Sequence, residues 1–393
     1  MKIESLHIKN FKAYKDARLE NLPAFCVIVG ANGTGKSTLF DIFAFIKDCL
    51  TFNLTKALQA RGGFDEIISR GCGGQDTIHF EIKCTLPVGN SEEQLTYELE
   101  IGQEQNNPYV KREKLTYGDA MGLSVLDFSC GDGYVLQNEE ARYSNNEADW
   151  DGQSLDAKDM LAIKGCGHFQ QFKAASAIRR YIESWHLSNF NINAACGVKE
   201  TAGFSEHLSA TGDNLQRVAK QIKDNHPVVF NTIIENLRRR VPGIDGVEIL
   251  ETPDKRLLLR FNSGDFKDPF MDRNTSDGTL KIFAYLVLLH DPQPHSFLCV
   301  EEPENQLYHT LLPELAEEFR AYAIRGGQVF VSTHSPEFLN AVALEEVYWL
   351  EKHNGFTAVK RAADDPKIRA FMSEGDQMGY LWSHNFFGEI APR

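Results

Sequence analysis

The stretch Gly30–Ser37 has the sequence Gly-Ala-Asn-Gly-Thr-Gly-Lys-Ser, and it decides how the rest of the chain is interpreted. It matches the pattern G-x-x-x-x-G-K-[ST] at every defined position. The apolar run Pro23–Val29 comes directly before it and suits a buried strand. From Ser37 onward, apolar residues recur at helical spacing. Strand, glycine loop and helix are the context that this motif needs, which disfavours the alternative of a chance glycine turn before a helix.

This loop is predicted to bind a polyphosphate. Small glycines let successive backbone N–H groups turn toward an anion at a helix N-terminus, where unpaired donors and the helix dipole favour negative charge. Lys36 should reach the β- and γ-phosphates, and Ser37 should ligate Mg²⁺. The predicted ligands are therefore ATP and Mg²⁺, and the predicted cofactor-binding residues in this loop are Asn32, Gly33, Thr34, Gly35, Lys36, Ser37 and Thr38.

Composition limits the class of protein. The chain has 393 residues, 42% of them hydrophobic, which is typical of a globular protein, and its length favours two lobes. Forty-one Lys and Arg against 55 Asp and Glu give a formal net charge of −14. A dedicated nucleic-acid binder is expected to be basic, so any DNA contact here would have to be a local patch.

Neither a membrane span nor a disulfide framework is expected. The longest apolar run, Ile282–Leu289, is far shorter than the ~18 to 20 residues that a spanning helix needs. The N-terminal residues 1–8 alternate apolar and polar, which predicts a strand instead of a signal peptide, so we expect a cytoplasmic protein. Eight scattered cysteines include no C-x-x-C pair, which indicates free thiols and no zinc ribbon.

The remaining chain divides by its hydrophobic pattern. Thr77–Tyr117 alternates like antiparallel hairpins, whereas Gly131–Gly165 is rich in Gly, Asp and Asn and is expected to be a loop or mobile insertion. Beyond residue 278, helices and strands alternate, which favours a mostly parallel sheet wrapped by helices. The other expected elements are helices at Gln170–Trp185, Asn214–Val241, Gly278–His290, Leu311–Ile324 and Pro336–Val342, and strands at Val247–Glu251, Arg256–Phe261, Ser296–Val300, Gln328–Ser332 and Val347–Leu350.

A pair of acids follows the strand Ser296–Val300. Ligand sites in open α/β sheets lie at the carboxyl ends of strands, where this strand delivers Glu301 and then Glu302. A phosphate loop needs a carboxylate for its metal and a group that positions the attacking water. Glu301 would act on Mg²⁺ through water, and Glu302 would polarise the lytic water. The alternative is a solvated strand end, which the glycine loop makes less attractive.

Two further sites complete the candidate set. His334 follows the next apolar strand, at the same predicted sheet edge. Ser276 is a plausible N-cap of the helix that follows it, and Gly278 would allow close approach of an anion. Taken singly, His334 has the alternative of a satisfied loop histidine, and Ser276 that of an ordinary cap.

Taken in order, these motifs resemble a known family. The set Gly30–Ser37, Ser276–Gly278, Glu301–Asn305 and Ser332–Ser335 is similar to the ABC-type ATPases of the SMC, RecF and OLD-like group. It looks most like the stand-alone predicted ATPases of the AAA_21 and AAA_15 type, with S-D-G-T as signature and E-E-P-E-N as acidic strand. The opening Ile8–Lys12 also resembles that group's first-strand motif.

The resemblance implies an α/β fold: an ABC-type P-loop ATPase head, with a mixed sheet wrapped by helices and an inserted α+β or helical lobe. The ATPase domain would comprise residues 1–120 and 242–393, and the insertion residues 121–241. ATP would be sandwiched between the P-loop of one protomer and Ser276 and Gly278 of another, in a homodimer or higher homo-oligomer. Glu302 would be the catalytic carboxylate, His334 the γ-phosphate switch histidine, and Asn305 part of a loop touching the opposite site.

Some features depart from the family pattern. Glu301 stands where an Asp is usual, and Gln75 is a weak candidate for the Q-loop glutamine. About 240 residues separate Lys36 from Ser276, and they show no sustained heptad pattern, so no long coiled coil is expected. The 59 residues after His334 are too few for the nuclease domain of OLD-like proteins, so any nuclease is expected to be another chain.

The leading hypothesis is an ATPase, hydrolysing ATP to ADP and phosphate, that controls a separate effector, a nuclease or toxin, in prokaryotic anti-phage defence. The defence role rests on analogy. The alternative is a RecF-like or SMC-like DNA-binding ATPase of repair or recombination. Its phosphate contacts would come from Arg238, Arg239 and Arg240 or from Lys111, Arg112 and Lys114, clusters whose ordinary interpretation is a solvated helix end or strand face. A nucleotide subunit of a membrane importer is disfavoured by the divergent signature.

Overall fold

The computed structural model describes the chain except residues 74, 120–121, 137–149, 198, 201–206, 265, 267 and 389–393; of residues 199–200 it describes the backbone. The described chain forms two compact units. Unit 1 comprises Met1–Trp185 and Ala343–Arg393, and unit 2 comprises His186–Val342. The predicted split into residues 1–120 plus 242–393 and an insertion at 121–241 remains a prediction, because compact packing and family insertion points need not coincide.

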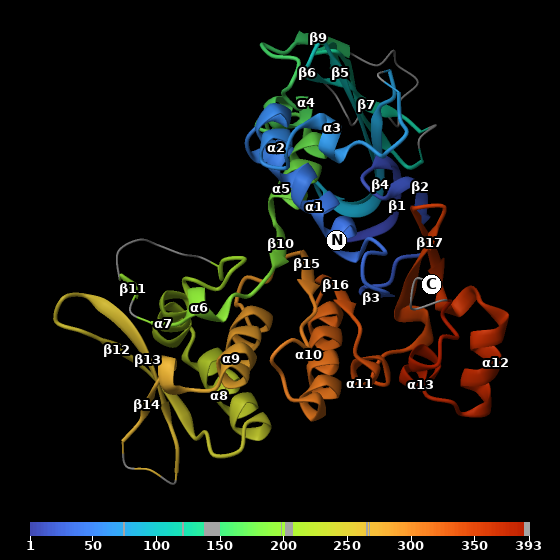
Figure 1. The fold of residues 1–393 in the computed structure, drawn as a ribbon. Coiled ribbons are helices and arrows are strands. Elements are labelled where there is room, and N and C mark those ends of the chain that lie inside the picture. Colours follow the sequence, from blue (N-terminus) through green and yellow to red (C-terminus); the bar gives the residue numbers. More distant parts are fainter. Residues whose placement is uncertain are drawn as a thin grey trace. The chain divides into compact units, whose positions relative to one another are not determined.

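An eight-stranded antiparallel sheet dominates unit 1 (Figure 1). Its strand order is β2-β1-β4-β5-β6-β7-β8-β9. The strands are β1 (Lys2–Phe11), β2 (Tyr14–Leu19), β4 (Ile78–Val88), β5 (Ser91–Glu104), β6 (Asn107–Tyr117), β7 (Ser124–Ser129), β8 (Asp132–Leu136) and β9 (Trp150–Ser154). In β4 burial alternates residue by residue, as in a sheet with one covered face. The predicted hairpins at Thr77–Tyr117 are confirmed.

Helices pack against this sheet. Rings from three elements meet in the core, with the Phe11 centroid 5.6 Å from that of Phe45 and 5.4 Å from that of Phe80. Such aromatic contacts bury large apolar areas, which stabilises the sheet and helix layers together. The helices of this part are α1 (Lys36–Thr51), α2 (Leu54–Gln59), α3 (Phe64–Ile67), α4 (Ala162–Cys166) and α5 (Lys173–Glu183).

The glycine loop of unit 1 joins a buried strand to a helix, as predicted. β3 (Phe25–Gly30) is buried along its whole length and runs parallel to β17 (Val347–His353), with Gly30 opposite Leu350. β18 (Phe356–Arg361) pairs antiparallel with β17. After the loop, α1 begins at Lys36. Two helices follow β18: α12 (Pro366–Glu374) and α13 (Met378–Ser383).

Unit 2 contains the second pair of predicted strands. β15 (Phe297–Glu301) and β16 (Gln328–Thr333) are parallel, with Glu301 opposite Ser332. α9 (Asp277–Leu289) is buried almost throughout, as befits a helix that is apolar on all sides. The other elements are β10 (Trp185–Ser188, starting at the last residue of unit 1), α6 (Ile192–Ala195), β11 (Lys199–Glu200), α7 (Leu215–Asn225), α8 (Pro227–Arg240), β12 (Gly246–Glu251), β13 (Arg256–Asn262), β14 (Phe270–Met271), α10 (Leu312–Ile324) and α11 (Pro336–Leu339).

Two expectations about elements were wrong. The segment Gly131–Gly165 contains the hairpin strands β8 and β9 and the helix α4, while 137–149 lies outside the described residues. Tyr134 and Trp150 are diagonal neighbours on β8 and β9, with their ring centroids 5.4 Å apart, and such cross-strand aromatic pairs stabilise exposed strands. The single helix expected at Asn214–Val241 is two helices, because Pro227 lacks an N–H and begins α8 at its first turn.

The expectations on coiled coils, membrane-spanning helices and thiols agree with the described part of the chain. The longest helix in the described part of the chain is α1, with 16 residues, so no coiled-coil arm is found there. No described helix is both long and apolar enough to cross a membrane. All eight cysteines are free thiols.

Candidate nucleotide site

The backbone of the glycine loop needs its glycines. Gly33 has φ 77° and Gly35 has φ 109°, in the left-handed region that side chains disfavour. A Cβ on Gly35 would lie 2.7 Å from Thr357 Oγ1. A Cβ on Gly30 would lie 2.4 Å from Thr34 Oγ1. Close packing therefore favours glycine at Gly30 and Gly35, whereas at Gly33, where a Cβ would meet nothing within 4 Å, the backbone conformation alone favours it.

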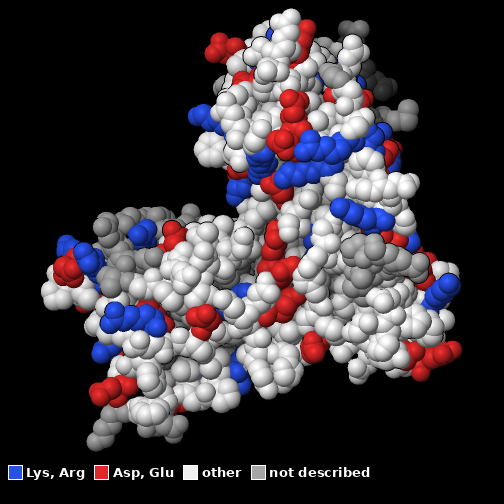
Figure 2. Space-filling view, in the orientation of Figure 1, with Lys and Arg blue, Asp and Glu red and all other residues white. Residues whose placement is uncertain are grey.

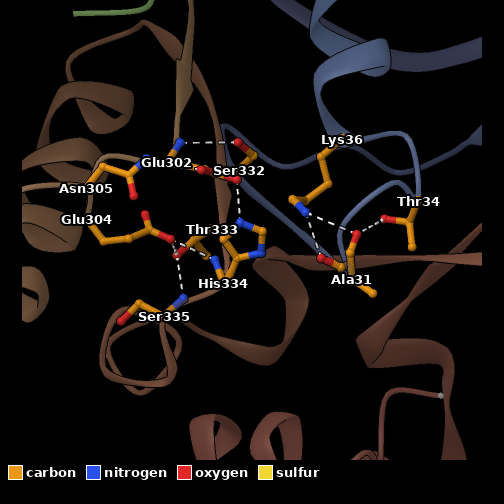
Figure 3. Close-up of polar contacts among 11 residues, drawn as sticks. Ala31, Thr34, Lys36, Glu302, Glu304, Asn305, Ser332, Thr333, His334 and Ser335 are labelled. Carbon is orange, nitrogen blue, oxygen red and sulfur yellow. Dashed lines mark hydrogen bonds and ion pairs between the residues drawn. The ribbon is translucent and has the colours of Figure 1, made fainter. Parts of the chain in front are cut away.

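Lys36 turns its ammonium group back into the loop (Figure 3). Its Nζ donates hydrogen bonds to Gly30 O at 2.7 Å and Ala31 O at 3.3 Å, and Thr34 Oγ1 donates to Ala31 O at 2.8 Å. Lys36 and Thr34 are buried. A charged phosphate oxygen is a stronger acceptor for an ammonium group than a neutral carbonyl, so Lys36 is placed where it can exchange these partners for a phosphate.

The loop is fastened by residues that the sequence patterns did not identify. Thr357 Oγ1, on β18, donates to Thr34 O at 2.6 Å, and Tyr14 OH, on β2, donates to Gly35 O at 2.9 Å. Burial raises the pKa of Tyr14, which keeps its hydroxyl protonated as a donor. These bonds hold the carbonyls of Thr34 and Gly35 in place, which rigidifies the binding backbone.

The residues of this loop fit a polyphosphate with its metal. Asn32, Gly33 and Ser37 are exposed, and Thr38 is half-buried at the start of α1. Exposed loop N–H groups, the Lys36 ammonium and the Ser37 hydroxyl form the donor set that binds phosphates and Mg²⁺ in P-loops.

In unit 2, Glu302 directly follows β15 and has an unusual backbone conformation. Its φ is 42°, in the left-handed region where a non-glycine residue is uncommon. Its N–H donates to Ser332 O at 3.0 Å, which extends the β15–β16 pairing by one residue. Residues held in such conformations cluster at functional sites, because the surroundings must fix them.

The carboxylate of Glu302 contacts two of the predicted residues (Figure 3). Its Oε1 forms a hydrogen bond with His334 Nε2, and its Oε2 accepts from Asn305 Nδ2 at 3.1 Å. The side chains of Glu302 and His334 are each about one-third exposed, at 32% and 34%. Both are thus fixed in direction and still reachable by a ligand.

Glu304 positions His334 and was not predicted. Its Oε1 accepts from Thr333 Oγ1 at 2.8 Å and from the backbone N of His334 at 2.7 Å. A carboxylate that accepts from backbone and side chain of adjacent residues fixes the start of the loop after β16. In the sequence, Glu304 was identified only as a member of the acidic motif Glu301–Asn305.

The signature serine caps α9, as predicted. Ser276 Oγ accepts from Thr279 N at 3.2 Å and is 2.7 Å from Thr279 Oγ1. An added Cβ on Gly278 would lie 3.0 Å from Gln306 O, so α9 begins in close contact with the loop after β15. Ser276 and Asp277 are exposed at this helix N-terminus, where the helix dipole favours an anion and the Asp277 carboxylate opposes one.

Lys281 ties α9 to the same loop. Its Nζ donates to Asn305 O at 2.7 Å, and burial lowers its pKa to about 8, against the opposing effect of the nearby Glu304 and Glu302 carboxylates. Lys281 is the only charged residue among Leu280–Leu289, and this isolated charge is the sequence signal that could have identified it as a functional residue. The signature helix and the acidic loop therefore form one connected group within unit 2.

The predicted residues are thus divided between the units. The P-loop residues lie together in unit 1, and Ser276, Gly278, Asn305, Glu302 and His334 lie together in unit 2. Glu301 ends β15 half-buried, and its role at Mg²⁺ stays a prediction. Gln75 is exposed ahead of β4, and its assignment as the Q-loop residue also stays a prediction.

Three of the six cations named in the DNA hypothesis form ion pairs. Arg240 pairs with Glu314 at 3.2 Å and Glu318 at 2.6 Å. Arg112 pairs with Asp127 at 2.8 Å, and Lys111 with Glu100 at 2.9 Å. Figure 2 shows acidic side chains interspersed with basic ones on the visible face. A phosphate contact by Arg240, Arg112 or Lys111 would have to compete with these carboxylate partners.

Comparison with known proteins agrees with the motif order. The family described as "AAA domain, putative AbiEii toxin, Type IV TA system" matches residues 25–340. A 114-residue part of the chain is 30% identical to the chromosome partition protein Smc of Methanococcus voltae, covering 28% of this chain and 9% of that protein. The chain therefore spans less than a tenth of this relative's length.

Solved structures share the fold. An SMC head bound to the C-terminal winged-helix domain of ScpA has a TM-score of 0.55 at 15% identity, covering 92% of this chain and 98% of that one. An Smc head with an extended coiled coil, bound to the C-terminal domain of ScpA from Pyrococcus furiosus, has a TM-score of 0.51 at 15% identity, covering 95% and 98%. At this identity the likeness concerns the fold alone.

Proposed function

Because the chain belongs to the AAA_21 family of AAA domains and has the fold of an SMC-type ATPase head, we propose that it is an Mg²⁺-dependent ATPase whose nucleotide state controls its assembly and a partner effector. The observation that carries this proposal is the pairing of Glu302 with His334 and Asn305 after β15, in a chain whose P-loop lies at the end of β3. The P-loop residues would bind phosphate, and Glu302 with its two partners would act on water.

The P-loop would hold the triphosphate. Backbone N–H groups of the loop and the Lys36 ammonium would neutralise the β- and γ-phosphate oxygens, and Ser37 would ligate Mg²⁺. When bound, Mg²⁺ would neutralise negative charge on the β- and γ-phosphates. Glu301 is proposed to bind this ion through water.

Glu302 would act as general base. Its carboxylate accepts a proton from the attacking water as the oxygen forms its bond to the γ-phosphorus and the bond to the ADP oxygen breaks. His334 and Asn305 hold this carboxylate by one oxygen each, so its orientation is set before substrate arrives. His334 is proposed to contact the γ-phosphate and thereby to sense hydrolysis.

The signature end of α9 would bind nucleotide held by a second protomer. Its exposed residues Ser276 and Asp277 and the close-packed Gly278 form a helix N-terminus joined to the Glu302 loop through Lys281. ATP would then act as the contact between copies, and its hydrolysis would release them. The net charge of −14 suits a protein partner more than nucleic acid.

The effector is proposed by analogy with the family description to be a separate toxin or nuclease in anti-phage defence. Co-expression of the chain with the product of its neighbouring gene, followed by mass measurement with and without ATP, tests this role. We expect a complex whose composition changes when ATP is added. A neighbour that never co-purifies, in either nucleotide state, contradicts the effector assignment without touching the ATPase assignment.

A further inference from the structure

Three imidazoles and a carboxylate gather at one place in unit 2. His186 lies in β10, His207 ahead of α7, Asp291 just after α9, and His295 just before β15. The ring centroids of His186 and His295 are stacked at 4.5 Å, and those of His207 and His295 are also 4.5 Å apart. Elements far apart in sequence therefore bring together the side chains that most often bind transition metals.

The donor atoms of this cluster are close enough to share one ion. One ligand atom each from His207, Asp291 and His295 all lie within 4.8 Å of one another. His207 Nδ1 is 2.9 Å from Asp291 Oδ2, the distance of a hydrogen bond. Zinc bonds of about 2.0 to 2.2 Å place tetrahedral donor atoms roughly 3.3 to 3.6 Å apart. Modest side-chain rotation therefore converts the present arrangement into a coordination shell.

The surroundings support such a shell. Asp291 Oδ1 accepts from the backbone N of Gln293 at 2.9 Å, which leaves Oδ2 directed at His207. A carboxylate with one oxygen fixed by a hydrogen bond is typical of metal ligands and of the residues that orient them. The side chain of Asp291 is 3% exposed and that of His207 is 32% exposed, so the cluster is buried on one side and reachable on the other.

We propose that His207, Asp291 and His295 bind one divalent transition-metal ion of the zinc class, with His186 or a water molecule as the fourth ligand. Imidazole donors favour this class over Mg²⁺ or Ca²⁺. The ion connects the segment before α7 to the end of α9 and the start of β15. Ser276 lies at the other end of α9, and Glu302 follows the other end of β15. The site therefore stabilises the two elements that position Ser276 and Glu302. This proposal does not depend on ATP hydrolysis.

A second cluster provides a matched control. His7, His79 and Glu81 of unit 1 also have ligand atoms within 4.8 Å of one another, on the neighbouring strands β1 and β4. There His7 Nε2 pairs with the exposed Asp16 at 2.7 Å, so the imidazole already has a charged partner near solvent. Replacing His79 removes an imidazole of similar chemistry without changing the unit 2 cluster.

The experiment uses the full chain, treated with chelator and dialysed against Zn²⁺ or Co²⁺ without nucleotide. We expect one equivalent of metal, and visible absorption of tetrahedral Co²⁺. His295→Gln should weaken Zn²⁺ binding at least about tenfold, because even the loss of a residue that only supports a metal ligand weakens binding by this factor. His79→Gln should bind Zn²⁺ like the parent chain. Zn²⁺ should also raise the unfolding temperature of the parent but not that of His295→Gln.

Two results would overturn the metal site: no stoichiometric Zn²⁺ or Co²⁺ in the parent chain, or equal metal loss in His295→Gln and His79→Gln. If His295→Gln does not fold, His207→Gln replaces it, because His207 is partly exposed and its removal leaves the rings of His186 and His295 in place. Retention of full metal affinity by a folded His207→Gln chain also contradicts the assignment.

Discussion

His334 Nε2 and Glu302 Oε1 form a hydrogen bond, although the two residues are 32 positions apart in the chain. The parallel pairing of β15 and β16 brings them together, since Glu301 lies opposite Ser332 and each functional residue follows its strand's end. A base whose direction is fixed by an imidazole on a neighbouring strand can act on a water without first reorganising. This relationship is the structural basis of the proposed hydrolysis.

Replacing Glu302 by Gln should abolish most hydrolysis and spare ATP binding. The amide keeps the shape of the side chain and a partner for Asn305, but it no longer accepts a proton. General bases contribute about 10² to 10⁴ in rate, so phosphate release should fall by that factor. Glu317→Gln, on the exposed face of α10, should retain normal turnover as the matched control. Undiminished phosphate release by Glu302→Gln would remove Glu302 from the mechanism.

Replacing Lys36 by Ala should weaken ATP binding itself. The ammonium is the one side-chain cation of the loop, and hydrogen bonds to charged groups contribute about 1.5 to 3 kcal/mol, which corresponds to roughly 10- to 150-fold in affinity. Titration with a fluorescent ATP analogue measures the change. Lys56→Ala, an exposed lysine of α2, should bind like the parent chain. Equal affinities for the two variants would contradict the phosphate role of Lys36.

Replacing Gly278 by Ala should reduce hydrolysis more than binding of ATP to the P-loop. The new Cβ would lie 3.0 Å from Gln306 O, so the loop after β15 must shift by a few tenths of an ångström. Because Asn305 of this loop holds Glu302, the shift changes the direction of the base. Gly152→Ala on β9, where a Cβ meets nothing within 4 Å, is the control. Phosphate release that is unchanged in Gly278→Ala would show that this contact is not coupled to the base.

Glu113 on β6 should make folding stability fall as pH rises. The carboxyl is fully buried and accepts hydrogen bonds from Tyr97 OH at 3.0 Å, Ile163 N at 3.1 Å and Ala162 N. Burial raises its pKa from 4.5 to about 7, against the opposing effect of these donors. Between these values the unfolded chain loses the proton and the folded chain keeps it. The stabilising contribution of protonated Glu113 is therefore complete below pH about 4.5 and falls by roughly 3 kcal/mol toward pH 7.

The measurement compares the parent chain with Glu113→Gln by denaturant unfolding between pH 5 and pH 8. The parent chain should lose more stability over this interval than the variant, because the neutral amide does not titrate. Parallel pH profiles for the two chains would mean that Glu113 ionises in the folded state as easily as in the unfolded one.

The parts of the site that could be predicted from the sequence are those determined by residues that are close together in the chain. Strand, glycine loop and helix around Lys36 follow from composition and periodicity, and the acids after Ser296–Val300 follow from the rule that sites lie at strand ends. The cap at Ser276 is likewise a local signal. The structure confirms these predictions because a few adjacent residues determine each element.

The rest depends on contacts between distant segments. Thr357 fastens Thr34 across 323 positions, and no local pattern marks a lone threonine on a strand for that role. Glu304 and Lys281 act through partners on other elements. The break at Pro227 was within reach of sequence reasoning, since proline inside a helical pattern ends the helix, but the continuous apolar spacing on both sides concealed it.

The most direct test of the central claim is the mass in solution of the Glu302→Gln chain with Mg²⁺ and ATP. The account predicts at least twice the mass of one chain with ATP and the mass of one chain without it. Replacing Ser276 by Arg in the same background should prevent the assembly while ATP still binds to the P-loop. A Glu302→Gln chain that binds ATP and keeps the mass of a single copy would contradict an ATP-driven switch.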